Sequence, residues 1–501
     1  MASDEQHGLV FPSDEQGERS TSKAGRAVVA DALRPTDPTG ARAAEHETGW
    51  RSGYLAHFRR LVEAGLGSPE DAAAVARAGL ASLHSRMRVL DEEGAERALG
   101  EWPEPATRLE QVEVRGTADP VTELVLPYRG ERLRGDAVRS RIETWVAAGV
   151  VEPTVAEAVE QVLANPEWLR LEGHTLAVLG AGAEMGPLPS LMRWGARVAA
   201  VDLARPAIWE RVLGLAADGA GTLVVPVVTS GRPTGDPAEG SGGSNGPLER
   251  SAGVDLLGDV PLVEGWLSEQ PGTLVLGNYV YADGATNVRV SMAVEELTVR
   301  LQEARDDVAL AFLATPTDVF AVPGDAVRHS TDAYEHRSVR AKTLGRPLRT
   351  LSGGRLLRRS YAAGSDPGII DSLVPQQGPN YALAKRLQRW RATVARRDGA
   401  TVSMNVAPPT RTRSVVKNRA LAAAYAGAHR FGVEVFEPAT SNVLMAALLV
   451  HDLHTGGGPR HEHPWQDEAY GAAHGGLWRA PYAPRSALGL AALLGYGAAR
   501  G

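Results

Sequence analysis

The segment Leu179-Gly-Ala-Gly-Ala-Glu-Met-Gly186 constrains the fold of this chain more than any other feature. It follows the apolar run Thr175–Leu179, which has the length of a buried strand, and it precedes a helical pattern. Glycines at this place allow the backbone to turn tightly from a strand into a helix. A strand that passes directly into a helix begins a βαβ unit, so the segment predicts a parallel sheet.

Short apolar runs of the same kind recur along the rest of the chain, and helical patterns separate most of them. These runs are Arg197–Val201, Thr222–Val228, Thr273–Leu276, Val308–Leu313, Thr401–Val406 and Val433–Phe436. Strands that alternate with helices favour a sheet covered by helices on both faces. The predicted fold class is therefore α/β, a doubly wound Rossmann-type parallel sheet with an α-helical N-terminal extension.

Composition divides the chain into four parts. Residues 1–48 are polar with mixed charge and have no apolar stretch, so we expect a disordered tail rather than a signal peptide. Helical spacing of apolar residues predicts an α-helical N-terminal region over 49–170. The Rossmann-type domain is expected over 171–453, and the His- and Gly-rich residues 454–501 are expected to form a mobile arm.

Two segments interrupt the pattern of the predicted Rossmann-type domain. Residues 229–253 are rich in Gly, Ser and Pro, which predicts a flexible surface insertion. Residues 325–380 are rich in arginine, and we expect them to cover the substrate pocket as a lid with little regular structure. The arginines between Arg337 and Arg359 would either face solvent or favour an acidic substrate.

Composition also argues against several classes of function. The net charge of −7 argues against nucleic-acid binding, and the absence of cysteine excludes disulfides and Cys-ligated metals. No stretch reaches the ~18 apolar residues of a membrane helix, so we expect a cytoplasmic protein with no membrane partner. A homo-oligomer is compatible with the sequence. No metal is expected, because the late histidines lack helical pairing and suit a solvated arm; they are His451, His454, His461, His463 and His474.

An acidic residue at the end of the next apolar run predicts a nucleotide site. Asp202 lies 22 residues after Gly180. A carboxylate at this position accepts hydrogen bonds from an adenosine ribose and repels a 2′-phosphate, and the helix after the glycines would face a pyrophosphate. The pattern therefore favours NAD(H) over NADP(H).

A second motif carries the candidate chemistry. Tyr381 and Lys385 lie one helical turn apart, which places the phenol and the ammonium on one face. We expect the ammonium to lower the pKa of the phenol, so that the tyrosine exchanges protons near neutral pH. Lys385 is one of only four lysines in an arginine-rich chain, which favours a role that needs an amine.

Taken together, these motifs resemble the short-chain dehydrogenase/reductase family over about Thr175–Leu453. The segment Leu276–Gly284 resembles the family's Asn-Asn-Ala-Gly segment, and Asn405–Thr412 resembles the segment beside its nicotinamide. The resemblance assigns cofactor contacts, including an adenine contact by the Asp255-Leu256 pair. The assigned residues are Gly180, Gly182, Gly186, Asp202, Asp255, Leu256, Asn278, Lys385 and Thr412.

The same resemblance implies the catalytic roles. Tyr381 would pass a proton to or from the substrate oxygen, and Lys385 would lower its pKa and hold the nicotinamide ribose. Thr315, or else Thr317, would take the place of the family's serine and hydrogen-bond the carbonyl oxygen. Asn287 would hold a water in the proton relay. The implied function is an NAD(P)(H)-dependent oxidoreductase acting on a small carbonyl or alcohol substrate, possibly acidic.

Two departures from the family pattern keep alternatives open. Glu184 replaces the middle glycine of the loop, and Pro409 replaces the glycine after Pro408. The glycine loop followed by Asp202 also resembles that of S-adenosylmethionine-dependent methyltransferases, which would leave the spacing of Tyr381 and Lys385 unexplained. A non-catalytic Rossmann-fold protein is the third possibility.

Overall fold

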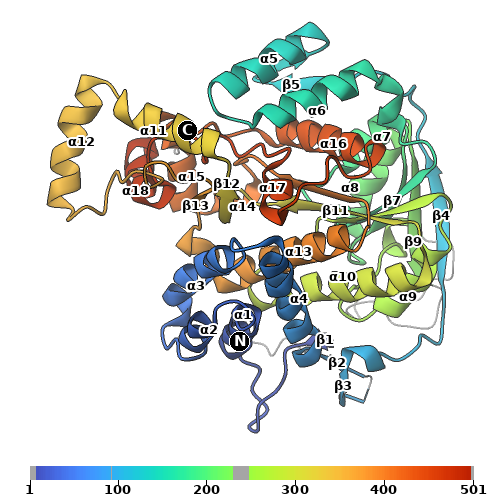
Figure 1. Ribbon diagram of the computed structural model, residues 1–501. Helices are drawn as coiled ribbons and strands as arrows, with labels where there is room; N and C mark the ends of the chain where they lie inside the picture. The colour runs from blue at the N-terminus through green and yellow to red at the C-terminus, as the bar shows by residue number, and fades with distance from the viewer. Residues whose placement is uncertain (1–6, 92, 229–247, 498–501) are drawn as a thin grey trace.

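The computed structural model describes residues 7–91, 93–228 and 248–497, and its centre is a seven-stranded sheet (Figure 1). The first predicted strand is β7 (His174–Leu179), and it lies in the middle of the sheet. Across the sheet the order is β14 (Val402–Val406), β11 (Val308–Ala314), β10 (Thr273–Asn278), β7, β8 (Arg197–Val201), β9 (Thr222–Val228) and β4 (Leu109–Arg115).

The strand order identifies the place where ligands bind in such folds. Numbered along the chain from β7, the six parallel strands have the order 3-2-1-4-5-6, which is that of dinucleotide-binding doubly wound sheets. The order reverses between β7 and β10, so a crevice opens there beyond the carboxyl ends of the strands. The predicted Rossmann-type class is confirmed, with β4 added antiparallel at the β9 edge.

Helices cover both faces of the sheet because its strands are apolar on both sides (Figure 1). One face packs against α9 (Val260–Ser268), α10 (Gly284–Ala304) and α13 (Gly378–Arg397). The other packs against α5 (Asp136–Ala147), α6 (Pro153–Ala164), α7 (Leu188–Trp194), α8 (Pro206–Ala217) and α16 (Pro438–His454). None of the described helices combines the length and the apolar character of a bilayer span.

The expectation of a disordered tail over 1–48 is wrong for the described residues from His7 onward. They form β1 (Gly8–Val10), α1 (Thr21–Leu33) and α2 (Pro38–Glu45), and Leu33 is fully buried. Before β4 follow α3 (Trp50–Ala64), α4 (Pro69–Arg86) and the short hairpin of β2 (Arg88–Leu90) and β3 (Glu96–Ala98). A Cβ at Gly79 of α4 would lie 2.4 Å from the Trp390 ring of α13, so α4 packs closely on the sheet's own helix layer.

This packing predicts a large effect from a substitution in the first helix. Leu33→Ala should lower the free energy of unfolding by about 2–5 kcal/mol, since it removes a fully buried leucine side chain. Lys23→Ala, on the exposed face of the same helix, should change it by less than about 0.5 kcal/mol. Denaturant titration of both variants decides the point, and a Leu33→Ala protein as stable as the Lys23→Ala protein would mean that α1 is not part of the core.

The C-terminal region is also part of the core rather than a mobile arm. It contains α17 (Pro464–Ala469) and α18 (Pro484–Gly495), and His474 between them is fully buried. Its Nε2 lies 2.8 Å from Glu152, and Arg479 lies 2.6 Å from the same carboxylate. Burial favours the uncharged acid, but Arg479 and His474 hold the pKa of Glu152 down at about 2. These pairs let charged residues of a polar segment enter the interior.

The arginine-rich insertion has more regular structure than expected. It contains α11 (Gly324–Glu335), α12 (Val339–Leu351) and β13 (Gly368–Asp371), which pairs antiparallel with β12 (Val319–Val322). The insertion packs on the C-terminal region, because Tyr361 donates to the Trp478 carbonyl at 2.6 Å. Most of the insertion predicted at 229–253 lies outside the described residues, and Val433–Phe436 forms only a single bridge, from Phe436 to Thr410.

Candidate functional site

The glycine loop follows β7 at the point where the strand order reverses. Gly180 has a φ of +82°, and a Cβ there would lie 3.0 Å from the carbonyl oxygen of Tyr279. A Cβ at Gly182 would lie 2.7 Å from the Arg211 guanidinium. Gly180 therefore requires glycine, since its φ is positive and backbone atoms approach it, whereas a side chain at Gly182 would have to displace Arg211. Gly186 ends the loop one residue before Pro187, which caps α7.

Asp202 lies beside the glycine loop, as the sequence predicts, and both of its oxygens accept backbone hydrogen bonds. Gly182 N–H donates to Oδ2 and Leu203 N–H donates to Oδ1, each at 2.8 Å. Burial raises the pKa of Asp202, while these hydrogen bonds and Arg211 oppose the rise. A carboxylate has about four lone-pair positions, so Asp202 keeps acceptor capacity for a ribose hydroxyl.

Glu184, the departure from the family's glycine pattern, joins the loop to the segment that follows β14. Its Oε2 accepts from the backbone N–H of Arg413 at 2.9 Å, and the Arg413 Nε lies 3.5 Å away. Thr412, which the resemblance makes a cofactor contact, immediately precedes Arg413, so this contact brings it next to the glycine loop. Asn442 of α16 donates to the Glu184 carbonyl at 2.9 Å and fixes the loop from the other side.

A small cavity of about 10 Å³, partly open to solvent, lies between the glycine loop, β11, β14 and α16. Its walls are mostly apolar, with a few polar side chains. The lining residues are Met185, Pro187, Tyr279, Phe312, Leu313, Ser403, Asn405, Asn442, Met445 and Leu449. Asn442 Oδ1 is buried and has no hydrogen-bond partner among the described residues, so the cavity offers an unused acceptor. A volume of this order admits about one water molecule.

Thr315 and Tyr381 meet at the end of β11. Thr315 follows the strand directly, Tyr381 lies in the first turn of α13, and the Thr315 hydroxyl lies close enough to the phenol to influence its pKa. Thr317 Oγ1 lies 2.8 Å from Thr315 Oγ1, so the two threonines form one polar pair. The ring of Tyr281 stands edge-on to the ring of Tyr381, with centroids 6.3 Å apart. The structure thus brings the predicted hydroxyl and phenol together.

The expected lowering of the Tyr381 pKa is wrong for this structure. Burial raises the pKa of the phenol, the hydrogen bond with Thr315 opposes the rise, and the negative charge of Asp318 adds to it. Lys385 does not offset the burial because its ammonium is directed elsewhere. Tyr381 is therefore a protonated donor at neutral pH.

Lys385 lies one turn further along α13 and faces the end of β11. Its Nζ donates to the Leu313 carbonyl at 3.3 Å and to Gln388 Oε1 at 3.1 Å. Gln388 Nε2 in turn donates to Asn278 Oδ1 at 3.2 Å. Burial lowers the pKa of Lys385 to about 8, so the ammonium is still mostly charged at pH 7. The chain from Asn278 to Lys385 thereby joins the ends of two neighbouring strands.

Three of the predicted site residues are engaged with other parts of the chain. Asn287 is buried and accepts from the backbone N–H of Ala282 at 3.1 Å, which fixes the loop before α10. Asp255 Oδ2 lies 2.8 Å from His7 Nε2, and Leu256 is buried. The N-terminal strand therefore lies against the residues predicted to contact adenine.

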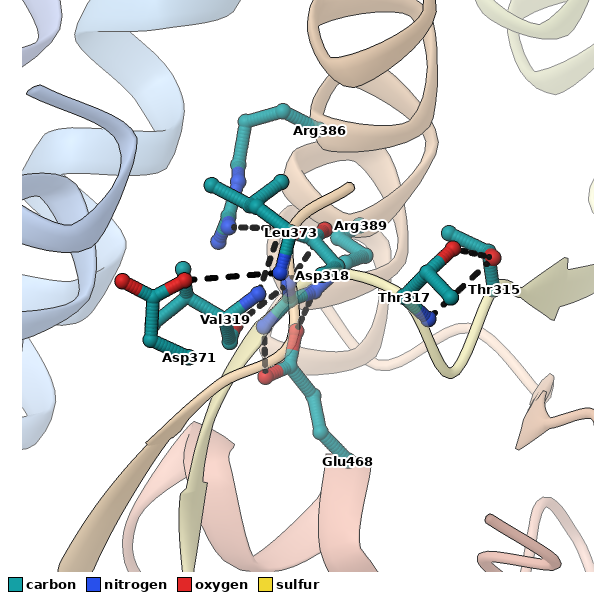
Figure 2. Close-up of polar contacts among 9 residues, drawn as sticks. All are labelled: Thr315, Thr317, Asp318, Val319, Asp371, Leu373, Arg386, Arg389 and Glu468. Carbon is teal, nitrogen blue, oxygen red and sulfur yellow. Dashed lines mark hydrogen bonds and ion pairs between the residues drawn. The ribbon is translucent and has the colours of Figure 1, made fainter. Parts of the chain in front are cut away.

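A buried charge cluster supports the site from behind (Figure 2). Asp318 is 2% exposed and pairs with Arg386 at 2.9 Å and with Arg389 at 2.7 Å. Arg389 also pairs with Glu468 at 2.6 Å. Figure 2 shows Asp318 on the segment that carries Thr315 and Thr317, so the cluster ties this segment to α13 one to two turns beyond Tyr381.

Two of these functional positions have only a weak signal in the sequence. Gln388 lies three residues after Lys385, and that helical spacing alone indicates contact between their side chains. Asp318 directly follows the threonine pair, but its burial is visible only once α13 and α17 supply their arginine and glutamate partners.

The residues around the cavity offer contacts of the kinds that a nicotinamide makes, but the cavity lacks room for its ring. The Asn442 acceptor suits an amide N–H, and Lys385 donates to the carbonyl of Leu313 in the cavity wall. A volume of about 10 Å³ is far smaller than such a ring, so the walls would have to move apart for one to enter. The carboxylate of Glu184 opposes a pyrophosphate beside the glycine loop, although the Arg413 guanidinium lies near that carboxylate.

Comparisons with known proteins add little to this geometry. No known family model matches the chain, and neither does any curated protein. Among solved structures, the chain is similar to a thiolation-reductase di-domain from an archaeal non-ribosomal peptide synthetase, with 10% identity and a TM-score of 0.27. The match covers 55% of this chain and 52% of that chain, so this chain spans about half the length of that structure. A similarity of this degree carries no argument on activity.

Proposed function

We propose that the protein is an NAD(H)-dependent oxidoreductase of the short-chain dehydrogenase/reductase type that reduces the carbonyl group of a small molecule. One observation carries the proposal: Thr315 and Tyr381 lie together at the carboxyl edge of a Rossmann-type sheet, with Lys385 one helical turn after Tyr381. Ligands of such sheets bind at this edge. A hydroxyl, a phenol and an ammonium together can bind a carbonyl oxygen and protonate it.

Each side chain has a distinct part in this reaction. A bound dinucleotide supplies the hydride that reaches the carbonyl carbon. Tyr381 donates its phenolic proton to the carbonyl oxygen, and the Thr315 hydroxyl orients that oxygen. Lys385, whose contacts with Leu313 and Gln388 fix its position, would hold the nicotinamide ribose.

The protonation state of Tyr381 favours reduction over oxidation. Burial raises the pKa of the phenol, so the group begins the cycle as a proton donor. Oxidation of an alcohol would need the phenolate as base, which a raised pKa disfavours. The proposed direction is therefore carbonyl to alcohol.

For the cofactor we propose NADH in preference to NADPH. Asp202 would accept hydrogen bonds from the adenosine ribose, and its charge would repel a 2′-phosphate. Gly180, Gly182, Gly186 and Thr412 would surround the pyrophosphate. Contacts of adenine with Asp255 and Leu256 stay a prediction, since His7 pairs with Asp255 and Leu9 of β1 donates to the carbonyl of the neighbouring Leu257.

A calorimetric titration of the purified protein with NADH, NADPH and S-adenosylmethionine tests the proposal. We expect NADH to bind most tightly and S-adenosylmethionine not to bind. Binding of S-adenosylmethionine alone would assign methyl transfer, the reaction that Asp202 and the glycine loop also permit. No binding of any of the three would leave a Rossmann-fold protein without a nucleotide function and would overturn the proposal.

Glu184 provides a sharper test of where the phosphates lie. Glu184→Gln should tighten NADH binding by about tenfold, since a unit charge a few ångströms from a pyrophosphate is worth about 1–2 kcal/mol near a protein surface. The substitution also frees Arg413 to meet the phosphates. Glu303→Gln, at the far end of α10, is the matched control and should leave the dissociation constant unchanged. Equal affinities of both variants would place the phosphates away from the glycine loop.

A further inference from the structure

One segment of the chain has a charge opposite to that of the whole. Between Arg337 and Ser365 there are eight basic residues and no acidic residue, whereas the complete chain has a net charge of −7. The basic residues are Arg337, Arg340, Lys342, Arg346, Arg349, Arg355, Arg358 and Arg359. This basic segment contains the whole of α12.

Helix α12 projects from the body of the molecule (Figure 1). None of its described side chains is buried, and two of its leucines are unusually accessible: Leu348 is 39% exposed and Leu351 is 86% exposed. These leucines lie three residues apart and share one face, while Lys342 and Arg346 share another. The helix is therefore amphipathic, and its contacts with the body, such as that of Arg349 with Tyr334, leave both leucines in solvent.

The two ends of the projection are held firmly. Arg337 stacks on the ring of Tyr334 with its guanidinium carbon 3.4 Å from the ring centroid, and Arg359 covers the same ring at 4.7 Å. Leu357 packs with Tyr334 and Tyr482 in a separate small core. These contacts fix both ends of the basic segment to the rest of the protein.

The central charges of the basic segment have no counter-charge. Arg346, Arg355 and Arg358 are exposed, and they form no ion pair with any other described residue. Leu348 and Leu351 thus lie in solvent beside cations that no described carboxylate neutralises, so apolar and basic groups are both available to contact another surface.

We propose that α12 and the residues that follow it to Arg359 bind the surface of an anionic lipid bilayer. An amphipathic helix with basic and apolar faces lies in the headgroup layer, where each cation meets lipid phosphates and the leucines enter the acyl boundary. A small anion would engage only one to three cations, and a nucleic acid would leave Leu348 and Leu351 in water. A projecting helix suits a flat surface, whereas an acidic protein would need a groove shaped to it.

The proposal does not depend on the reaction proposed above, and it departs from the expectation of no membrane partner. Co-sedimentation of the full chain with vesicles tests it, using phosphatidylcholine alone and phosphatidylcholine with 30% phosphatidylglycerol, about the anionic fraction that attracts basic segments. We expect binding to the anionic vesicles only, released by 0.5 M salt, about three to four times the physiological level.

Two pairs of variants separate charge from apolar contact. Lys342→Gln/Arg346→Gln should weaken binding about 30-fold, since each basic residue near an anionic surface contributes about fivefold. Leu348→Ser/Leu351→Ser should weaken it even at low salt. The matched controls are Arg132→Gln/Arg170→Gln and Val112→Ser, exposed positions outside the basic segment, and they should bind like the wild type.

Three outcomes would overturn the proposal. Equal binding to neutral and anionic vesicles would exclude an electrostatic contact, and unchanged binding by both α12 variants would place the contact elsewhere. Absence of vesicle binding together with binding to duplex DNA or to polyglutamate would assign the basic segment to a different polyanion. Every changed side chain is at least partly exposed, so each variant should fold. Circular dichroism of each variant checks this.

Discussion

Replacing Tyr381 by phenylalanine is expected to lower the rate of carbonyl reduction by about 10²–10⁴-fold, the usual cost of losing a general acid. The affinity for NADH should stay within about twofold, because the phenol acts only in proton transfer and the aromatic ring remains. Lys385→Ala should reduce both the rate and the affinity, since the proposed ammonium also contacts the nicotinamide ribose. Steady-state kinetics and calorimetry on the same samples separate the two effects.

A matched control comes from another partly buried tyrosine. Tyr470→Phe removes a hydroxyl whose pKa burial also raises, but it lies outside the Thr315–Tyr381 pair. This variant should retain the wild-type rate. A Tyr381→Phe enzyme that is as active as Tyr470→Phe would remove Tyr381 from the reaction and would end the dehydrogenase proposal.

The second large effect is expected at Asp318. Asp318→Ala leaves Arg386 without a partner and Arg389 with Glu468 alone, all inside the protein. Breaking a buried ion pair from one side costs about 3–5 kcal/mol because a charge stays buried without compensation. Urea denaturation followed by tryptophan fluorescence measures the loss of stability.

The control is the exposed pair between Arg77 and Asp398, whose nitrogen and oxygen are 2.7 Å apart. Asp398→Ala should cost about 0–1 kcal/mol, since water screens such a pair. If Asp318→Ala lowered the free energy of unfolding as little as Asp398→Ala, the buried charge cluster would have no supporting role.

The Asp318 contribution should also depend on pH. Burial alone would raise the pKa of this carboxyl, but Arg386 and Arg389 hold it below its ordinary value of 3.8. A group whose pKa is lower in the folded state stabilises the fold above its unfolded pKa and loses that effect as it is protonated. The difference in stability between the wild type and Asp318→Ala should therefore shrink below about pH 4.

The sheet was predictable from the sequence, whereas both ends of the chain were not. The strands and the glycine loop carry local signals, namely an apolar run, a tight turn and a helical period, and these suffice for the Rossmann-type order. Residues before Thr48 and after His454 are polar on average, so their composition predicts solvent-exposed segments. Their burial depends on partners far along the chain, such as Glu152 for His474 and Arg479.

The candidate site was predictable in part for the same reason. Thr315 and Tyr381 follow predicted elements whose ends converge in any parallel sheet, so their meeting could be expected. The raised pKa of Tyr381 could not be predicted, because the Lys385 ammonium turns toward Gln388 and does not offset the burial of the phenol. Asn287 matches the family spacing, yet its side chain is used by the Ala282 backbone.

The transfer of label from NADH tests the central claim most directly. The protein is incubated with a mixture of small carbonyl compounds and NADH deuterated at the 4-position, on either face of the ring, and the products are analysed by mass spectrometry. The account predicts an alcohol with one deuterium on its carbinol carbon, formed by the wild type and not by Tyr381→Phe. Binding of NADH without transfer of deuterium to any carbonyl compound would contradict it.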